Sequence, residues 1–208
     1  MDFLYIILLS YMLGTIPFAL IFVKLTVNKD IRKEGTGNVG AMNSYDITGK
    51  KWIGICVTIC DCFKGIIAII LAIFIAGDYP ISYVLASFFV VLGHNYNIFL
   101  KFKGGRGLAT ALGCLICINL FFPICWLILW LIGFYLIKKN VHIANSFATF
   151  LLPFFPFILP FAFFQYFSFF LYLPETHLKI IIVLLCFLIL ARHLNVISRP
   201  VLKIEKKK

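Results

Sequence analysis

Apolar runs long enough to cross a bilayer recur along this chain of 208 residues, and they constrain its fold more than any other feature. A membrane-spanning helix needs about 20 mostly apolar residues, and 62% of this chain is hydrophobic while 13% is charged. A soluble globular domain is therefore excluded. We predict an all-α integral membrane protein with seven transmembrane helices, two of them short, in one domain over residues 1–208. The expected spans are Phe3 to Val23, Trp52 to Ala76, Ile81 to about Leu92, Leu108 to about Ile118, Phe121 to Ile137, Ile143 to Tyr172 and Leu178 to Leu190.

The basic residues are distributed unevenly between the loops. Lys and Arg outnumber Asp and Glu by 19 to 8, an excess that in a soluble chain is typical of nucleic-acid binding. Apart from Lys64 inside a span and Lys179, however, every cation follows the first, third, fifth or seventh span. Short cytoplasmic loops accumulate Lys and Arg. We therefore expect an odd number of crossings, an outside amino terminus, a cytoplasmic carboxyl terminus, and membrane lipids instead of nucleic acid as partners.

The first span and the cysteines both have a simple structural interpretation. The first span lacks the basic segment that opens a secretory signal and is long enough to cross, so we expect it to remain in the protein. All seven cysteines fall within apolar runs, and Cys114-x-x-Cys117 has no second pair or histidine nearby. Buried small hydrophobic side chains are the favoured interpretation, and we expect no metal and no cofactor.

The first polar island, residues 24–51, holds three glycines within six residues. Such spacing lets the backbone turn sharply and direct successive N–H groups at one point, as in sites that hold phosphate or a developing oxyanion. An ordinary flexible loop would contain the same glycines. The density of small polar groups beside a membrane span favours an anion site. Its candidate residues are Arg32, Gly35, Thr36, Gly37, Asn38, Gly40 and Asn43.

The second polar island, residues 93–110, is a glycine-rich cationic turn that leads directly into an apolar helix. The free N–H groups and the positive end of that helix should face the same place as Lys103 and Arg106, which predicts an anion cradle. A Walker-type loop is excluded because the G-K-[ST] ending is missing. Anchoring at lipid headgroups would explain the cations but neither the glycines nor His94. The candidate residues are His94, Lys103, Gly104, Gly105, Arg106 and Gly107.

The third polar island follows the last span. If that helix continues past the membrane surface, Arg192, Asn195 and Arg199 share one face, and His193 lies about one step away. A cationic cluster at a helix end is just as typical of a headgroup anchor. All three islands fall on the cytoplasmic side of the predicted topology, so they can form one pocket at the inner interface, with apolar helices around it that can accept an acyl chain.

A charged pair lies within the second span. Asp61 and Lys64 are three residues apart on one helix face, close enough to form an ion pair. Charges at membrane depth are costly and are usually retained for a reason. A structural clasp between this helix and the cytoplasmic loops is the favoured interpretation, and a proton relay is the alternative.

In order and in position relative to the spans, these islands resemble the three motifs of the bacterial acyl-phosphate-dependent glycerol-3-phosphate acyltransferases. That family consists of seven-helix inner-membrane enzymes, and the resemblance covers nearly the whole chain. The matching residues are Gly14-Thr15-Ile16-Pro17-Phe18, Asp30-Ile31-Arg32 with Gly35 to Ala41, Asp61 with Lys64-Gly65, Gly93-His94 with Phe99 to Thr110, and Arg192-His193 with Arg199 and Glu205.

The resemblance implies transfer of a fatty acyl group from acyl phosphate to the 1-hydroxyl of glycerol 3-phosphate, which yields 1-acylglycerol 3-phosphate and phosphate. An acyl phosphate is already activated, so the reaction needs phosphate binding, oxyanion stabilisation and removal of a hydroxyl proton. The proton acceptor could be His94, His193 or a substrate phosphate, and the resemblance favours the phosphate. We assign catalytic roles to Thr36, Asn38, His94 and His193, and substrate binding to Arg32, Gly35, Gly37, Gly40, Asn43, Lys103, Gly104, Gly105, Arg106, Gly107, His142, Asn145, Asn195 and Arg199.

The chain departs from the family pattern at several positions. The family's serine in the first glycine loop is Thr36, and its arginine three residues beyond the motif asparagine is Asp46, a reversal of charge. The other departures are Arg106 for a lysine, Asn97 for a proline, His142 or Asn145 for hydroxyls of a serine-rich turn, and Val196 for an asparagine with Asn195 beside it. These departures favour the acceptor side as the place of divergence.

Three functional interpretations follow from the sequence. The first is a monomeric acyltransferase in the inner membrane with its site on the cytoplasmic side. The second is a divergent paralogue that uses another acceptor. The third is an anion or lipid transporter, because short spans with glycine-rich ends also form transport sites. The almost uniformly apolar outer half of the chain argues against transport, which requires access from both faces.

Overall fold

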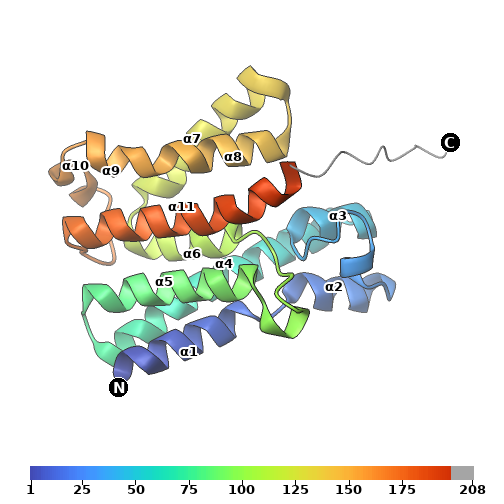
Figure 1. Ribbon diagram of the computed structural model, residues 1–208, viewed down its shortest axis with the longest axis horizontal. Helices are drawn as coiled ribbons and strands as arrows, with labels where there is room; N and C mark the ends of the chain where they lie inside the picture. Colours follow the sequence, from blue (N-terminus) through green and yellow to red (C-terminus); the bar gives the residue numbers. More distant parts are fainter. Residues whose placement is uncertain (198–208) are drawn as a thin grey trace.

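The computed structural model describes residues 1–197, apart from the side chains of Lys138 and residues 194–197. Within that range the secondary structure is helical, and the longer helices lie side by side (Figure 1). The α-helices are α1 Asp2–Gly14, α2 Phe18–Val27, α3 Ala41–Thr48, α4 Lys51–Ala76, α5 Pro80–Asn95, α6 Leu108–Ile118, α7 Phe121–Gly133, α8 Val141–Leu151, α9 Phe155–Ile158, α10 Phe161–Gln165 and α11 Glu175–Ile197. Short 3₁₀ segments are η1 Ile31–Lys33, η2 Ile98–Leu100 and η4 Leu152–Phe154, and η3, Phe134–Lys138, is a π-helical turn.

Five helical segments of the described chain are long and apolar enough to cross a membrane. They are Asp2–Val27, Lys51–Ala76, Pro80–Leu100, Val141–Ile158 and Glu175–His193. The third is longer than the sequence predicted, because helix α5 continues through the polar residues Gly93, His94 and Asn95. Because these residues are polar or glycine, hydropathy alone predicts a loop. They are buried inside the protein, where the helix continues. The two shorter apolar helices, Leu108–Ile118 and Phe121–Ile137, coincide with the predicted fourth and fifth spans.

The predicted sixth span does not run as one helix from Ile143 to Tyr172. The helical segment ends at Ile158, and Leu159 is extended with a ψ of 146°. A residue before proline is disfavoured in the helical conformation, and Pro160 follows. The chain then turns back through α10, where Phe164 stacks on Phe122 of α7 with ring centroids 5.4 Å apart.

Helices α4 and α6 approach each other closely at glycine residues (Figure 1). A Cβ atom on Gly113 of α6 would lie 1.9 Å from the carbonyl oxygen of Cys62 on α4, and one on Gly65 would lie 2.2 Å from that of Thr110. Neither contact leaves room for a side chain. Such small-residue contacts let two helix backbones approach within a membrane.

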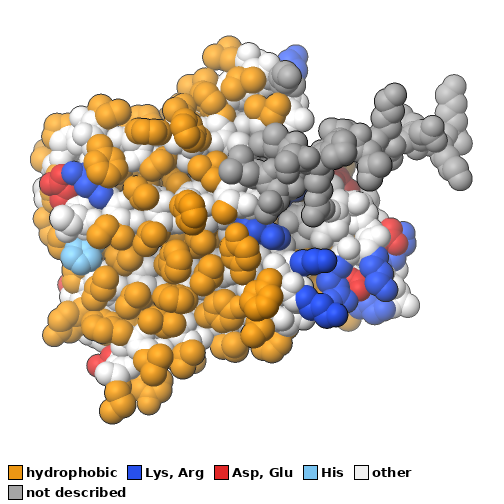
Figure 2. Space-filling model, viewed as in Figure 1, with side chains coloured by type: hydrophobic (Ala, Val, Ile, Leu, Met, Phe, Trp, Pro, Cys, Tyr) orange, Lys and Arg blue, Asp and Glu red, His pale blue; other side chains and the backbone are white. Residues whose placement is uncertain are grey.

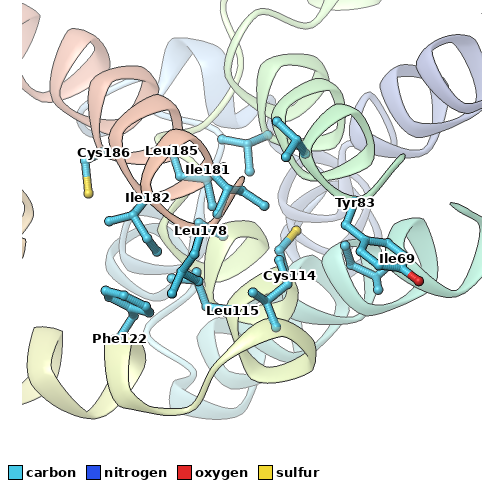
Figure 3. Close-up of a cluster of buried hydrophobic side chains, with 14 of the residues drawn as sticks. Ile69, Tyr83, Cys114, Leu115, Phe122, Leu178, Ile181, Ile182, Leu185 and Cys186 are labelled. Carbon is cyan, nitrogen blue, oxygen red and sulfur yellow. The ribbon is translucent and has the colours of Figure 1, made fainter. Parts of the chain in front are cut away.

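The hydrophobic core runs along the centre of the bundle. Side chains of α5, α6, α7 and α11 meet there, among them Tyr83, Leu115, Phe122 and Ile182 (Figure 3). Large apolar side chains also cover most of the outer surface, whereas Lys and Arg gather at the end that holds α2 and α3 (Figure 2). An apolar belt with charges at one end is the pattern of a protein whose solvent is mainly lipid.

Candidate active site

A cavity of about 340 Å³ lies beside that charged end, between α3, α4, α6, α8 and α11. One part of its wall is polar and the other is apolar. The polar part comprises Asn38, Gly40, Thr58, Asp61, His94, Arg106, Gly107, His142, Asn145 and Thr149. The apolar part comprises Leu108, Leu112, Leu115, Pro123, Trp126, Leu152, Ile182, Leu185, Cys186 and Ile189. The cavity can therefore hold an amphiphile with a polar head and an apolar chain.

Asn43 organises the first glycine loop. Its amide nitrogen donates to the carbonyl oxygen of Asn38 at 3.0 Å, and its side-chain oxygen accepts from the backbone N–H of Thr36 at 2.9 Å. Gly35 has a φ of +55°, and a Cβ there would lie 2.3 Å from that same oxygen. The asparagine is 1% exposed, so it shapes the loop from behind. Asn38 and Gly40 are thereby placed in the cavity wall.

Arg32, predicted to bind substrate, lies outside the cavity wall and forms an ion pair with Asp30. Its Nη2 atom is 2.7 Å from Oδ2 of Asp30, and its backbone N–H donates to the same carboxylate. The Arg32 guanidinium lowers the pKa of Asp30 to about 2, so this carboxylate stays ionised at neutral pH. The pair closes the η1 turn that leads into the glycine loop.

The amides of the second glycine turn are used within the protein, whereas the sequence predicted free amides at the start of the helix that follows. Gly104 and Gly105 donate their N–H groups to the carbonyl oxygens of Asn95 and His94, at 3.2 and 3.0 Å. Their own carbonyl oxygens accept hydrogen bonds from the Arg192 guanidinium, at 2.8 and 3.1 Å. The open amides of this region are those of the first turn of α6, which begins after Gly107 without a side-chain cap.

Arg106 precedes that helix end and reaches into the cavity. Its Nη1 atom lies 2.9 Å from Nδ1 of His142. Burial and the neighbouring Arg192 charge lower the pKa of Arg106. Within residues 1–197, no carboxylate forms an ion pair with Arg106. A half-buried guanidinium with no carboxylate partner in residues 1–197, beside an uncapped helix N-terminus, is an arrangement that can bind an anion.

Asn145, on α8, links α7 to the last helix. Its side-chain oxygen accepts from Nε1 of Trp130 at 2.7 Å, and its amide nitrogen lies 3.5 Å from Nε2 of His193. The other ring nitrogen of His193, Nδ1, lies 2.9 Å from the carbonyl oxygen of Ile189. That carbonyl only accepts, so Nδ1 carries the proton and Nε2 is the ring's acceptor.

The structure therefore brings some of the predicted site residues together in the cavity wall and places others away from it. Asn38, Gly40, His94, Arg106, Gly107, His142 and Asn145 line one cavity. Gly35, Gly37 and Asn43 shape the first loop, Thr36 and Lys103 are exposed outside the wall, and the buried His193 touches Asn145. Arg199 and the Asn195 side chain lie outside the described residues.

Sequence reasoning missed three members of the site. Thr58 and Thr149 line the cavity, and Trp130 hydrogen-bonds to Asn145. Thr58 lies three residues before Asp61 on α4, so helical spacing could have placed it on the same face. Trp130 and Thr149 sit inside apolar runs and carry no comparable signal.

The family model described as glycerol-3-phosphate acyltransferase matches residues 4–203. This chain belongs to that family. The model spans all three polar islands and both glycine turns. It therefore supports the resemblance on which the sequence interpretation was based.

Relatives of the family match over most of their length. Proteins described as glycerol-3-phosphate acyltransferase include one from Bartonella quintana, 32% identical over 206 residues, with 97% of this chain and 90% of the relative covered. Another, from Macrococcus caseolyticus, is 36% identical over 207 residues, with 97% and 95% covered. A third, from Pelagibacter ubique, is 37% identical over 153 residues, with 74% and 78% covered.

Solved structures of one family member share the fold. The crystal structure of PlsY (YgiH), an integral membrane glycerol 3-phosphate acyltransferase, in its glycerol 3-phosphate form, superimposes with a TM-score of 0.76 at 30% identity, covering 96% of this chain and 92% of the other. The lysophosphatidic acid form gives a TM-score of 0.74 at the same identity. The family fold and the apolar helices together show a multi-pass integral membrane protein.

Proposed function

We propose that this chain transfers a fatty acyl group from acyl phosphate to the 1-hydroxyl of glycerol 3-phosphate, giving 1-acylglycerol 3-phosphate and phosphate. The observation that carries the proposal is the half-buried Arg106, without a carboxylate partner in residues 1–197, beside the uncapped start of α6 and facing an apolar chamber. Both proposed substrates carry phosphate, and one carries a long alkyl chain. Family membership supplies the acyl-transfer chemistry.

The proposed reaction needs no protein nucleophile. The 1-hydroxyl oxygen forms a bond to the acyl carbon, and the bond between that carbon and the phosphate oxygen breaks with its electron pair going to the phosphate. Arg106, Asn38 and the first amides of α6 stabilise the negative charge that develops on the acyl oxygen and the leaving phosphate. The hydroxyl proton passes to a phosphate oxygen of the substrate, whose second pKa of about 6 suits the transfer.

His193 and His142 are less suited than a substrate phosphate to accept the proton. Nε2 of His193 already faces the Asn145 amide, and His193 is 1% exposed. Nδ1 of His142 faces the Arg106 guanidinium. A histidine whose accepting nitrogen is occupied by a donor is a poor base, so these contacts favour substrate assistance.

The proposal includes a membrane orientation. We place seven crossings in the inner membrane, with the amino terminus outside and the cavity opening to the cytoplasm, in a monomer that forms one domain over residues 1–208. The gathering of Lys and Arg at the cavity end supports this orientation. The amino terminus lies at the other end of the bundle, opposite the end of α11, as an odd number of crossings requires (Figure 1).

An acylation assay tests the proposal. The purified protein in detergent is given palmitoyl phosphate and radiolabelled glycerol 3-phosphate, and both lipid product and inorganic phosphate are measured. We expect the two products in equal amounts. Phosphate release that depends on a different acceptor would support the divergent-paralogue hypothesis, and anion flux into liposomes without turnover would support a carrier.

A further inference from the structure

A buried ion pair lies beside the second glycine turn. Nζ of Lys64 is 2.8 Å from Oδ1 of Asp61, and the two side chains are only 2% and 5% exposed. Ions inside a protein at membrane depth are costly unless they are paired and tied to further groups. The contacts of this pair should therefore show why it is retained.

The pair connects α4 to three other helices, α1, α2 and α5. The ammonium group of Lys64 donates to the carbonyl oxygen of Gly14 at the end of α1, at 3.3 Å, and lies 5.0 Å from the ring centroid of Phe18. The carboxylate of Asp61 lies 3.6 Å from Nδ1 of His94 on α5. The chain from Lys64 through Asp61 therefore ends on the imidazole ring.

His94 in turn supports the glycine turn. Its carbonyl oxygen accepts the N–H of Gly105 at 3.0 Å. A Cβ atom on Gly105 would lie 2.0 Å from Nε2 of the ring, so the backbone of the turn rests directly against the imidazole. Arg106 is the next residue. Nδ1 of the ring faces Asp61 and Nε2 faces Gly105, so the imidazole is packed between the carboxylate and the turn.

We propose that His94 is a positioning residue, held by the Asp61–Lys64 pair, whose ring fixes the Gly104–Gly105 turn and thereby places Arg106 and the first amides of α6 around a phosphate group. The inference rests on the proposed function in taking phosphate as the ligand. It gives His94 a different role from the catalytic one predicted from sequence, and it gives the charged pair a role in substrate binding.

A size-compensation experiment tests the contact between the ring and the turn. Gly105→Ala pushes a methyl group into the imidazole, and we expect kcat/KM for palmitoyl phosphate to fall by about 100-fold, as for a displaced site. His94→Ala should cost less, because no reacting atom is lost. The double variant His94→Ala/Gly105→Ala should be more active than Gly105→Ala alone, because the ring that clashes is gone.

The matched control is Gly93→Ala. Its Cβ would lie 2.2 Å from the backbone carbonyl oxygen of Tyr11, a clash of similar size but against backbone. His94→Ala should give no rescue in that background. A double variant no more active than Gly105→Ala, or less active, would overturn the proposal and favour His94 as a catalytic base.

A second readout does not depend on turnover. Inorganic phosphate should raise the thermal midpoint of the wild-type protein in detergent, because a ligand that binds the folded state stabilises it. Gly105→Ala should lose this phosphate-dependent shift, and the double variant should regain it. Wild-type protein that shows the shift without acyl transfer would refute the proposed reaction but not the positioning role.

The ion pair is tested by removing both charges together. Asp61→Leu/Lys64→Met leaves no unpaired charge, so the variant should fold with a thermal midpoint close to that of the wild type. We expect it to lose most of the phosphate-dependent shift and to raise KM for palmitoyl phosphate more than it lowers kcat. Wild-type KM and an undiminished phosphate shift would show that the pair is only a clasp between helices.

Discussion

At the scale of single residues, the candidate site is centred on Arg106, which forms no ion pair with a carboxylate among the described residues. Arg106 is half-buried, faces the cavity and contacts His142 instead of a carboxylate. The sequence alone places this residue in a glycine-rich turn, because the charge of Arg106 and the glycines beside it are local features. It could not show that the Arg192 guanidinium would donate hydrogen bonds to that turn, because the two segments meet only in the folded chain.

Replacing Arg106 tests the phosphate site most directly. Arg106→Ala should lower kcat/KM by about 100-fold or more, in the range seen when one donor to a developing charge is removed. Arg106→Lys should retain more activity, because it keeps the charge while losing the planar fork. Asn38→Ala, on the opposite loop, should lower kcat/KM by a similar factor. Membrane insertion, measured by extraction and gel filtration in detergent, should not change, and full activity in either alanine variant would exclude the cradle.

Asp46 tests the acceptor side. It stands on α3 where the family pattern has arginine, and it lies close enough to His142 for an electrostatic interaction. Asp46→Arg should lower KM for glycerol 3-phosphate by about tenfold, which corresponds to about 1.4 kcal/mol. Asp46→Asn should give an intermediate value. An unchanged KM in both variants would show that residue 46 does not act on the acceptor.

Replacing Trp130 tests whether this residue holds His193 in place through Asn145. Its indole N–H fixes the orientation of the Asn145 amide, which in turn faces the histidine. Trp130→Phe keeps most of the packing and removes one hydrogen bond worth about 1 kcal/mol, so kcat should fall by about fivefold. The expected signature is a lower kcat with a fall of only about 2–4 °C in the thermal midpoint, as about 1 kcal/mol gives in a chain of this size. Equal losses in Trp130→Phe and in a double variant with Asn145→Ala would confirm that the two residues act together.

At the scale of helices, each predicted span overlaps a helical segment, but only five described segments are long and apolar enough to cross a membrane, and hydropathy did not predict every end. Helix α5 extends beyond the predicted limit because Asn95, its last residue, donates to the carbonyl oxygen of Leu188 inside the protein. Just after the helix, Asn97 donates to that of Thr15. Helical structure stops early after α8 because proline follows Leu159. Polar residues satisfied by distant segments, and turns hidden in phenylalanine-rich sequence, are features that a hydropathy profile does not resolve.

The contact between α4 and α6 gives a prediction at this scale. Gly113→Ala would place a methyl group 1.9 Å from the Cys62 carbonyl, so the two helices must move apart. Overpacking of this kind costs about 1–3 kcal/mol, and the thermal midpoint in detergent should fall accordingly. The control is Gly49→Asn, at an open left-handed position that asparagine tolerates. A Gly113→Ala midpoint equal to that of the control would contradict the packing.

At the scale of the whole molecule, the charge distribution predicts the topology, and the predicted topology in turn predicts where the site lies. The charge distribution predicts that the three islands share one membrane face. The structure brings Asn38, Arg106 and His142 into one cavity wall, far apart as they are in sequence. The sequence predicted apolar helices around this pocket but not which residues line it, because Leu115, Trp126 and Ile182 look the same in sequence as residues that face lipid.

Cysteine labelling tests the orientation. In a background without native cysteines, Thr36→Cys and Lys103→Cys should react with an impermeant maleimide only from the cytoplasmic side, since both residues are exposed near the cavity end. Asp2→Cys should react only from the opposite side. Labelling of positions 36 and 103 from different faces of the membrane would refute the common site.

The hydrogen bonds from Arg192 to the carbonyl oxygens of Gly104 and Gly105 also bear on how the protein matures. During synthesis the glycine turn emerges long before the residue that braces it. A nascent chain inserted only as far as α8 would contain both glycine turns but would still lack Arg192. We therefore expect catalytic activity only after α11 has entered the bilayer. An incompletely synthesised chain would then not consume the acyl donor.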